Sequence, residues 1–413
     1  MATFPSSTPA FLPPLRCGKK SSVQAGLHQI RRYNVVYYLI MKKIIALAGI
    51  LALTVSCKTA QTSSAGNSLK DAFKNKFYIG TAMDLPQIHG TDVKSDDIIR
   101  KHFSSIVAEN CMKSMFIQPE EGKFFFDDAD KFVAFGEKNK MFIIGHTLIW
   151  HSQLPKWFFI GKDGKDVSPE VLKQRMKSHI SALVGRYKGR VKGYDVVNEA
   201  IMEDGSYRKS KFYEILGEEF IPLAFQYAQE ADPNAELYYN DYNEWFPEKV
   251  KTVVKIVNDM KSRGIRVDGV GMQTHVGLDT PSLQEYEKAI TDYAAAGVKV
   301  NITEMEISAL PSPWGTSANV ADKVAYDAKM NPYTKGLPQN VQTEWENRYL
   351  EFFNLFLKHQ DKIRRVTLWG VTDNQSWKND FPVKGRTDYP LLFDRNYQAK
   401  PVVEKIIDLT KSK

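Results

Sequence analysis

The stretch Tyr194-Asp195-Val196-Val197-Asn198-Glu199 is an apolar, β-branched run that ends on a glutamate, and Val300-Asn301-Ile302-Thr303-Glu304-Met305-Glu306 has the same form. Short runs of this kind are typical of buried strands, so each segment places a carboxylate at the end of a strand. A carboxylate there is unfavourable unless it is paired, hydrogen-bonded or used in chemistry. One such glutamate alone is more often part of a structural ion pair. Two of them suggest one catalytic cleft, provided that the fold brings the strands together.

Eight short apolar runs occur along the chain, and segments with helical periodicity, such as Val250 to Met260, separate them. The expected strands are Phe77–Ala82, Ser105–Ala108, Met141–Gly145, Gly193–Val197, Glu236–Tyr239, Gly269–Met272, Lys299–Thr303 and Arg365–Leu368. No Pro/Gly-rich linker interrupts this alternation. The pattern predicts one α/β domain over residues 71–413, folded as a single (β/α)8 TIM barrel.

The net positive charge of the chain comes from the residues before Asp71. Of the 56 Lys and Arg residues, nine precede Asp71, which is the first acidic residue, and this leaves 47 basic against 48 acidic residues in the expected domain. The formal net charge of +8 therefore belongs to the leader. Because the domain is close to neutral, the sequence gives no basis for a nucleic-acid partner.

Residues 41–57 have the form of a secretory signal. Met41-Lys42-Lys43 is followed by an apolar run from Ile44 to Val55, which is too short to span a bilayer. Its end, Thr54-Val55-Ser56-Cys57, resembles a bacterial lipobox in which the Cys becomes the lipidated N-terminus, although a Leu is usual where Thr54 stands.

The N-terminal part of the chain is therefore expected to contain three segments. Residues 1–40 are an upstream extension that the natural protein lacks, residues 41–57 are the signal peptide, and residues 58–70 are a flexible tether. We expect export, either as a periplasmic or outer-surface lipoprotein held in the membrane through lipidated Cys57, or as a secreted protein if the signal is cleaved without an anchor.

The residues that follow the expected strands are polar, reactive or aromatic. They are Glu109 and Asn110, His146, Asn198 and Glu199, Asn240 and Asp241, Gln273 and His275, Glu304, and Trp369. The C-terminal ends of barrel strands surround one cleft, so these side chains are expected to converge. Two carboxylates in such a cleft suit glycosidic bond cleavage, where one protonates the leaving oxygen and the other attacks or stabilises the sugar carbon.

Two further features fit a sugar-cleaving site. Glu304 and Glu306 are two positions apart, so on a strand they point to the same face, and His275 is placed to bridge them. Trp150, Trp369 and Trp377 lie at or just after strand ends, where an aromatic ring can stack on a sugar. Any one of these tryptophans is more often core packing, but three near one rim favour a sugar ligand.

Metal chemistry is the main alternative at these residues. His146 and His151 are five positions apart, which is not the helical four-residue spacing of a zinc site, although with Glu109 they could still meet in space. The expected domain has no other cysteine than Cys111, so neither an intradomain disulfide nor a cysteine-based metal site can form. The sequence has no glycine-rich phosphate loop and no nucleophile elbow, and we expect no metal or cofactor.

Several motifs occur in an order that resembles glycoside hydrolase family 10, the endo-1,4-β-xylanases, over essentially all of residues 71–413. The motifs are Glu109-Asn110-Cys111-Met112-Lys113, Gly145-His146-Thr147-Leu148-Ile149-Trp150-His151, Asp195-Val196-Val197-Asn198-Glu199-Ala200, Gln273-Thr274-His275, Ile302-Thr303-Glu304 and Leu368-Trp369-Gly370. Each motif is modest evidence, whereas the ordered set is specific. The resemblance implies a retaining enzyme that acts on xylan and xylo-oligosaccharides. It gives no indication of a protein partner.

The resemblance also implies roles for individual residues. Glu199 is the expected acid/base, Glu304 the nucleophile, Asn198 the partner of the sugar 2-hydroxyl, and His275 the residue that holds the nucleophile. The side chains expected to line the sugar-binding side of the cleft are Glu109, Asn110, Lys113, His146, Trp150, Gln273, Trp369 and Trp377.

The chain departs from the family pattern at Glu306, where an Asp is usual, and in the long connection from Ser308 to Asn340. That connection contains Trp314 and Tyr333, and it is either a wall of the cleft on the leaving-group side or a packed loop without substrate contact. Two other functions stay open: hydrolysis of another β-1,4-glycan, and glycan binding without catalysis.

Overall fold

The computed structural model describes residues 68–312, 328–382 and 384–411. The expected upstream extension, signal peptide, Cys57 and Trp314 lie outside these residues, as does the tether up to residue 67. Ser68 caps the short helix α2 (Leu69–Ala72), and Leu69 is buried in the core. Residues 68–70 therefore belong to the folded domain and not to the expected tether.

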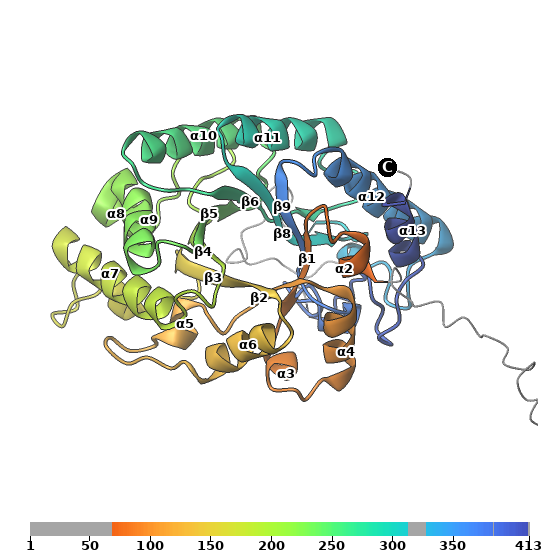
Figure 1. Ribbon diagram of the computed structural model, residues 1–413, viewed down its shortest axis with the longest axis horizontal. Coiled ribbons are helices and arrows are strands. Elements are labelled where there is room, and N and C mark those ends of the chain that lie inside the picture. The colour runs from red at the N-terminus through yellow and green to blue at the C-terminus, as the bar shows by residue number, and fades with distance from the viewer. Residues whose placement is uncertain (1–67, 313–327, 383, 412–413) are drawn as a thin grey trace, which may run out of the picture. The chain divides into compact units, whose positions relative to one another are not determined.

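Eight parallel strands form a closed ring (Figure 1). They are β1 (Tyr78–Met83), β2 (Ser105–Ala108), β3 (Phe142–Trp150), β4 (Gly193–Asn198), β5 (Glu236–Asp241), β6 (Gly269–Met272), β8 (Lys299–Ile307) and β9 (Ile363–Leu368). Neighbours follow the chain order around the ring, and β6 pairs with β8 to complete it. The two-residue strand β7 (His275–Val276) pairs with the end of β8. The predicted eight-stranded barrel is confirmed.

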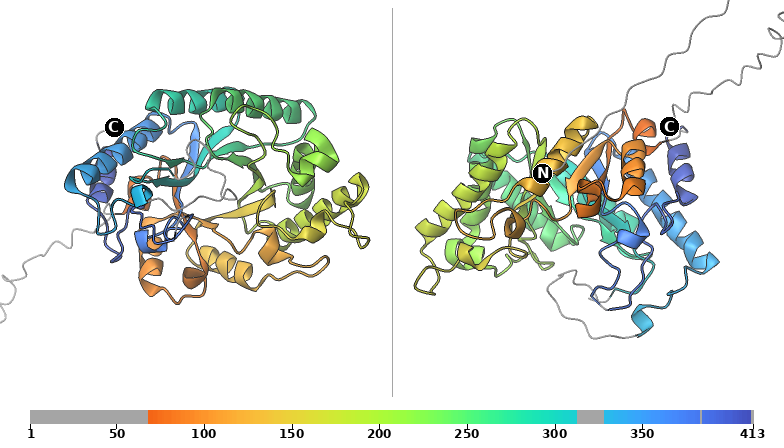
Figure 2. Two further views of the ribbon diagram at one scale, coloured as in Figure 1. Left: turned by 180° about the vertical axis from the view of Figure 1, so that it is seen from behind. Right: turned by 90° about the horizontal axis from the view of Figure 1, so that it is seen from below.

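Helices surround the ring, as Figure 1 shows from the front and Figure 2 from behind and below. They are α3 (Leu85–Ile88), α4 (Val93–His102), α5 (Ser114–Ile117), α6 (Asp127–Lys138), α7 (Pro169–Arg186), α8 (Lys211–Leu216), α9 (Phe220–Ala231), α10 (Pro247–Ser262), α11 (Leu283–Ala295), α12 (Gln339–Lys358) and α13 (Val402–Leu409). None of the helices in the described ranges is long and apolar enough to cross a membrane.

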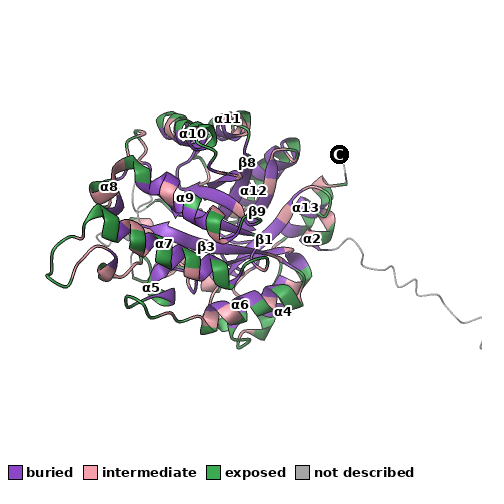
Figure 3. Ribbon diagram, turned by 60° about the vertical axis from the view of Figure 1, so that its left-hand side comes forward, coloured by how far each residue is buried: buried purple, intermediate pink, exposed green. Residues whose placement is uncertain are grey.

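Helix α7 illustrates how the sequence sets these elements. The Ser168 side chain accepts a hydrogen bond from the backbone of Val171, and Pro169 occupies the first helical position, where its missing N–H has no cost. Leu172, Met176 and other apolar residues recur every three to four positions and are buried. Figure 3 shows the same division over the domain, with buried strands inside and exposed outer faces of the helices.

The interior of the ring is filled. Ala82, Val107, Ile144 and Tyr238 pack together, one from each of four strands. Gly193 makes room for the Tyr238 ring, because a Cβ at Gly193 would lie 2.7 Å from it. The barrel therefore provides a packed floor beneath the C-terminal ends of the strands.

Strands β3 and β8 extend beyond their predicted ends, to Trp150 and Ile307. The expectation that His146 and Glu304 follow their strands is wrong, because both lie within them. It is also wrong for Asn198, the last residue of β4, and for Asn240 and Asp241, the last two residues of β5. Polar residues interrupt the apolar runs here, and the register of pairing shifts at the same places, between His146 and Ile149 and between Ile302 and Met305. Reading apolar runs cannot detect a strand that continues through polar positions.

Candidate active site

A cleft of about 980 Å³ opens at the C-terminal ends of the strands. The predicted site residues that line it are Glu109, Asn110, Lys113, His146, Trp150, Asn198, Glu199, Gln273, His275, Glu304, Trp369 and Trp377. Glu306 does not line the cleft and is fully buried. The predicted convergence of these strand ends is therefore seen in the structure.

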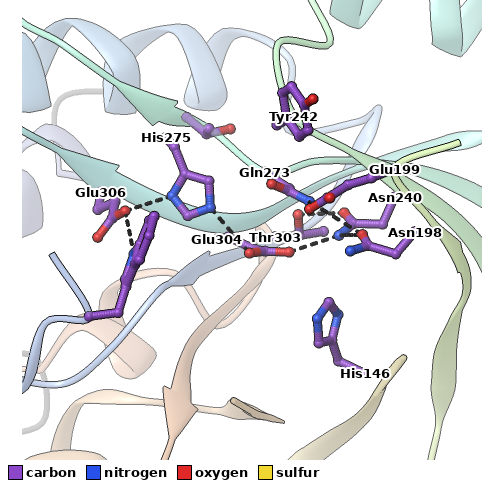
Figure 4. Close-up of polar contacts among 12 residues, drawn as sticks. His146, Asn198, Glu199, Asn240, Tyr242, Gln273, His275, Thr303, Glu304 and Glu306 are labelled. Carbon is purple, nitrogen blue, oxygen red and sulfur yellow. Dashed lines mark hydrogen bonds and ion pairs between the residues drawn. The ribbon is translucent and has the colours of Figure 1, made fainter. Parts of the chain in front are cut away.

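Glu304 lies on β8 between two hydrogen-bond donors (Figure 4). Its Oε1 accepts from Asn240 Nδ2 at 2.8 Å, and its Oε2 lies 3.2 Å from His275 Nε2. Burial alone would raise the pKa of Glu304, but the His275 hydrogen bond and the nearby histidine charges hold it below its ordinary value. This carboxylate is therefore ionised at neutral pH, as a nucleophile requires.

Asn240, one of the residues expected to converge on the cleft, links Asn198 to Glu304. Its Nδ2 donates to both Glu304 and Asn198, and its Oδ1 accepts from Thr303 at 2.7 Å. Asn198 and Asn240 are direct partners in the β4–β5 register. The alignment of these two strands therefore brings the two amide side chains together.

Glu199 directly follows β4 and is 7% exposed. Its Oε2 accepts from Trp150 Nε1 at 2.8 Å, and its Oε1 accepts from Gln273 Nε2 at 3.1 Å. Both oxygens are thus held by neutral donors, Trp150 at the end of β3 and Gln273 directly after β6. Trp150, expected as a stacking surface for sugar, also orients this carboxyl group.

His275 bridges Glu304 and Glu306, as the sequence predicted. Its Nδ1 lies 2.7 Å from Glu306 Oε1, which also accepts from Trp377 Nε1 at 2.8 Å and lies 3.1 Å from Lys378 Nζ. Burial alone would lower the pKa of His275, but the charges of the two glutamates and their hydrogen bonds raise it to about 9. His275 is therefore a cation at neutral pH.

This charge makes a pH-dependent contribution to stability. Because the pKa of His275 is about 9 when folded and near 6.5 when unfolded, the contribution is complete below pH 6.5 and is lost as pH rises through 9. Between pH 6 and pH 10, the unfolding free energy of the wild-type protein should fall. We expect this fall to be larger than that of His275→Gln by on the order of 3 kcal/mol. Urea unfolding of both proteins at several pH values measures the difference, and parallel curves would contradict the assignment.

Lys113, Asn110 and Glu109 form a polar group at another part of the cleft. Lys113 Nζ donates to Asn110 Oδ1 at 3.0 Å and lies 5.1 Å from the centre of the Trp150 ring. Burial, with a smaller effect from the charge of Asp84, raises the pKa of Glu109 to about 7. Near neutral pH, Glu109 can therefore donate or accept a hydrogen bond with a sugar hydroxyl.

The geometry does not support the metal alternative at the histidines. His146 Nδ1 lies 3.0 Å from Asp195 Oδ2, and the His146 ring packs against Trp369 with 5.3 Å between centres. His151 is not among the residues that line the cleft, and both of its ring nitrogens are buried without a hydrogen-bond partner among the residues that the structure describes. Across residues 68–312, 328–382 and 384–411, no three His, Cys, Asp or Glu side chains are grouped so that they could hold a metal ion.

Comparison with known proteins identifies the family of the chain. Residues 68–409 match glycosyl hydrolase family 10. The chain belongs to this family. Over 343 residues, it is 49% identical to endo-1,4-beta-xylanase A of Xylanibacter ruminicola, an alignment that covers 83% of this chain and 93% of that protein.

The chain is also similar to solved structures. A GH10 endoxylanase from a sugarcane soil metagenome has 45% sequence identity and a TM-score of 0.78, and the match covers 83% of this chain and 99% of that one. A mutant solved in complex with xylotriose has 34% identity and a TM-score of 0.73, with the same coverage of both chains.

The chain departs from the family 10 pattern at Glu306 and in the connection from Ser308 to Asn340, and the structure describes Glu306 and both ends of this connection. The longer Glu306 reaches His275 with Oε1, while its Oε2 is buried without a hydrogen-bond partner in the described part of the chain. From the long connection, Leu310 to Ser312 and Pro332 to Tyr333 line the cleft. The described ends of this connection therefore form part of the cleft wall.

Proposed function

We infer that the chain is a retaining endo-1,4-β-xylanase that hydrolyses internal bonds of xylan in polysaccharide degradation. Its substrates are xylan and xylo-oligosaccharides. The observation that carries this inference is the placement of Glu199 and Glu304 in one cleft of a family 10 barrel, with every predicted sugar-lining residue around them. The named relatives with this fold are xylanases, and one solved neighbour binds xylotriose.

Glu304 and Glu199 have unequal roles in the double displacement. The Glu304 carboxylate attacks the anomeric carbon while Glu199 gives its proton to the leaving oxygen, which breaks the glycosidic bond and forms a glycosyl ester. Glu199 then removes a proton from water, and the oxygen of that water displaces Glu304 from the sugar. Each cycle consumes one water and returns both carboxyl groups to their first states.

Asn198 is the proposed partner of the sugar 2-hydroxyl. Its Oδ1 accepts from Asn240 Nδ2 at 2.9 Å and from Gln273 Nε2 at 3.3 Å, which fixes the orientation of the amide. Its Nδ2 can then donate to a sugar in the cleft. Hydrogen bonds to this hydroxyl strengthen in the transition state of glycosidases.

Activity on xylan, compared with activity on cellulose and mannan, tests the proposed xylanase function. We expect reducing sugars to be released from xylan and not from cellulose or mannan, because the similar proteins named above are endo-xylanases. Equal release from another β-1,4-glycan would favour the broader hydrolase. Binding to xylan without release of sugar would instead identify a glycan-binding protein.

We also propose that the protein is exported by the signal at residues 41–57 and anchored through lipidated Cys57. The lipobox-like sequence supports this proposal. In a bacterium that processes lipoproteins, wild-type protein should fractionate with membranes, and Cys57→Ser should fractionate with soluble proteins. The same distribution for both forms would contradict the anchor.

A further inference from the structure

The backbone of Glu199 has a conformation that side-chain-bearing residues seldom adopt. Its φ is +58°, in the left-handed region, although the residue is not a glycine. Such a conformation persists where surrounding contacts impose it, and it is common at functional sites. The direction in which the Glu199 carboxyl group points therefore depends on whatever holds this backbone.

Arg208 makes contacts that can hold the backbone of Glu199 in this conformation. Its Nε donates to the carbonyl oxygen of Glu199 at 2.8 Å, and its own backbone N–H donates to the carbonyl oxygen of Ala200 at 2.8 Å. Two successive carbonyls after β4 are thus bound to one residue. A second guanidinium nitrogen, Nη2, donates to the hydroxyl of Tyr242.

The remaining contacts hold other atoms of the same turn. The N–H of Glu199 donates to the carbonyl of Asn240, and the N–H of Ala200 donates to the Tyr239 hydroxyl. Among the described residues, Arg208 is the donor to the Glu199 carbonyl oxygen. Removing its side chain would leave that carbonyl unpaired and would release one end of the strained peptide.

Arg208 does not act by touching substrate. It is 9% exposed and is not among the residues that line the cleft. Its charge interacts with Asp241 and with the Glu199 carboxylate. The most direct route from Arg208 to the reaction is therefore its contact with Glu199.

We propose that Arg208 is a positioning residue that holds Glu199 in the orientation needed to protonate the leaving oxygen. This inference rests on the proposed acid/base role of Glu199. A misplaced acid matters most when the leaving group needs its proton, and little when the leaving group is a stable anion. Xylohexaose has a poor leaving group, and 2,4-dinitrophenyl β-xylobioside has a good one.

The test compares kcat/KM on these two substrates, since kcat/KM reports the step in which the bond to the leaving group breaks. Arg208→Met should lose about 10²-fold on xylohexaose and change little on the dinitrophenyl substrate. Arg208→Lys should recover part of the loss, because its ammonium group can still donate to the carbonyl. Arg175→Met is the matched control: Arg175 also donates to backbone carbonyls, but at Trp157 and Ile160, away from the cleft floor.

The outcomes separate the alternatives. Equal losses on both substrates in a folded Arg208→Met, or no loss on xylohexaose, would overturn the proposal. If Arg208→Met fails to fold in a thermal melt, the same comparison is made with Arg208→Lys, for which equal losses would overturn it as well. Glu199→Ala serves as reference: if it shows no dependence on the leaving group, the acid/base assignment is the part that fails.

Discussion

Glu304→Ala is expected to lower kcat on xylan by about 10⁴-fold or more, because it removes the atom that forms the covalent intermediate. The carboxylate is held ionised by His275 and Asn240, and among the described carboxylates that line the cleft Glu304 alone has both of these partners. Its loss therefore removes a step of the reaction. Initial rates of reducing-sugar release from xylan, with enzyme at high concentration, measure the effect.

External azide sharpens the Glu304 prediction. With the side chain shortened to alanine, azide can enter from the face that the carboxylate occupied and should give an α-linked glycosyl azide from an activated substrate. Glu306→Gln is the matched control, because Glu306 lies on the same strand and is buried but does not line the cleft. It should be less impaired and form no azide product. Near-full activity of Glu304→Ala would refute the nucleophile assignment.

Glu199→Ala should lower kcat/KM on xylo-oligosaccharides by about 10³-fold, which is the contribution of a positioned general acid. The loss should nearly vanish for 2,4-dinitrophenyl β-xylobioside, whose leaving group needs no proton. For that substrate, release of the sugar from Glu304 becomes slow, since the general base for water is gone. A burst of dinitrophenolate followed by a slow steady rate is the expected time course.

The stereochemistry of azide rescue separates Glu199 from Glu304. In Glu199→Ala, azide should intercept the glycosyl enzyme from the face opposite the ester and give a β-linked azide. Gln273→Ala is a suitable comparison, because Gln273 donates to Glu199 but carries no titratable proton. Equal losses of Glu199→Ala on both leaving groups would contradict its role as the acid.

Much of the barrel could be predicted, because its strands are short apolar runs between amphipathic helices. The expected strand Ser105–Ala108 is β2 with the same bounds. The ends of β3 and β8 could not be predicted in this way. His146 on β3 and Glu304 and Glu306 on β8 are polar, and the backbone continues to pair there through shifted register.

The membership of the site could also be predicted, whereas its internal contacts could not. The order of the motifs placed Glu199, Glu304 and His275 in one cleft, and the two-residue spacing predicted the bridge to Glu306. Arg208 was missed because a side chain that donates to a backbone carbonyl leaves no periodic pattern in a sequence.

The central claim is that Glu304 carries the covalent intermediate and Glu199 the proton. The most direct measurement uses 2,4-dinitrophenyl 2-deoxy-2-fluoro-β-xylobioside. Its fluorine slows both steps by destabilising the electron-poor transition state, while its leaving group lets the first step proceed, so the intermediate accumulates. Mass spectrometry of the protein and its peptides should show one fluoroxylobiosyl group attached to Glu304. A label on Glu199 or on any other residue, or turnover without a label, would contradict the claim.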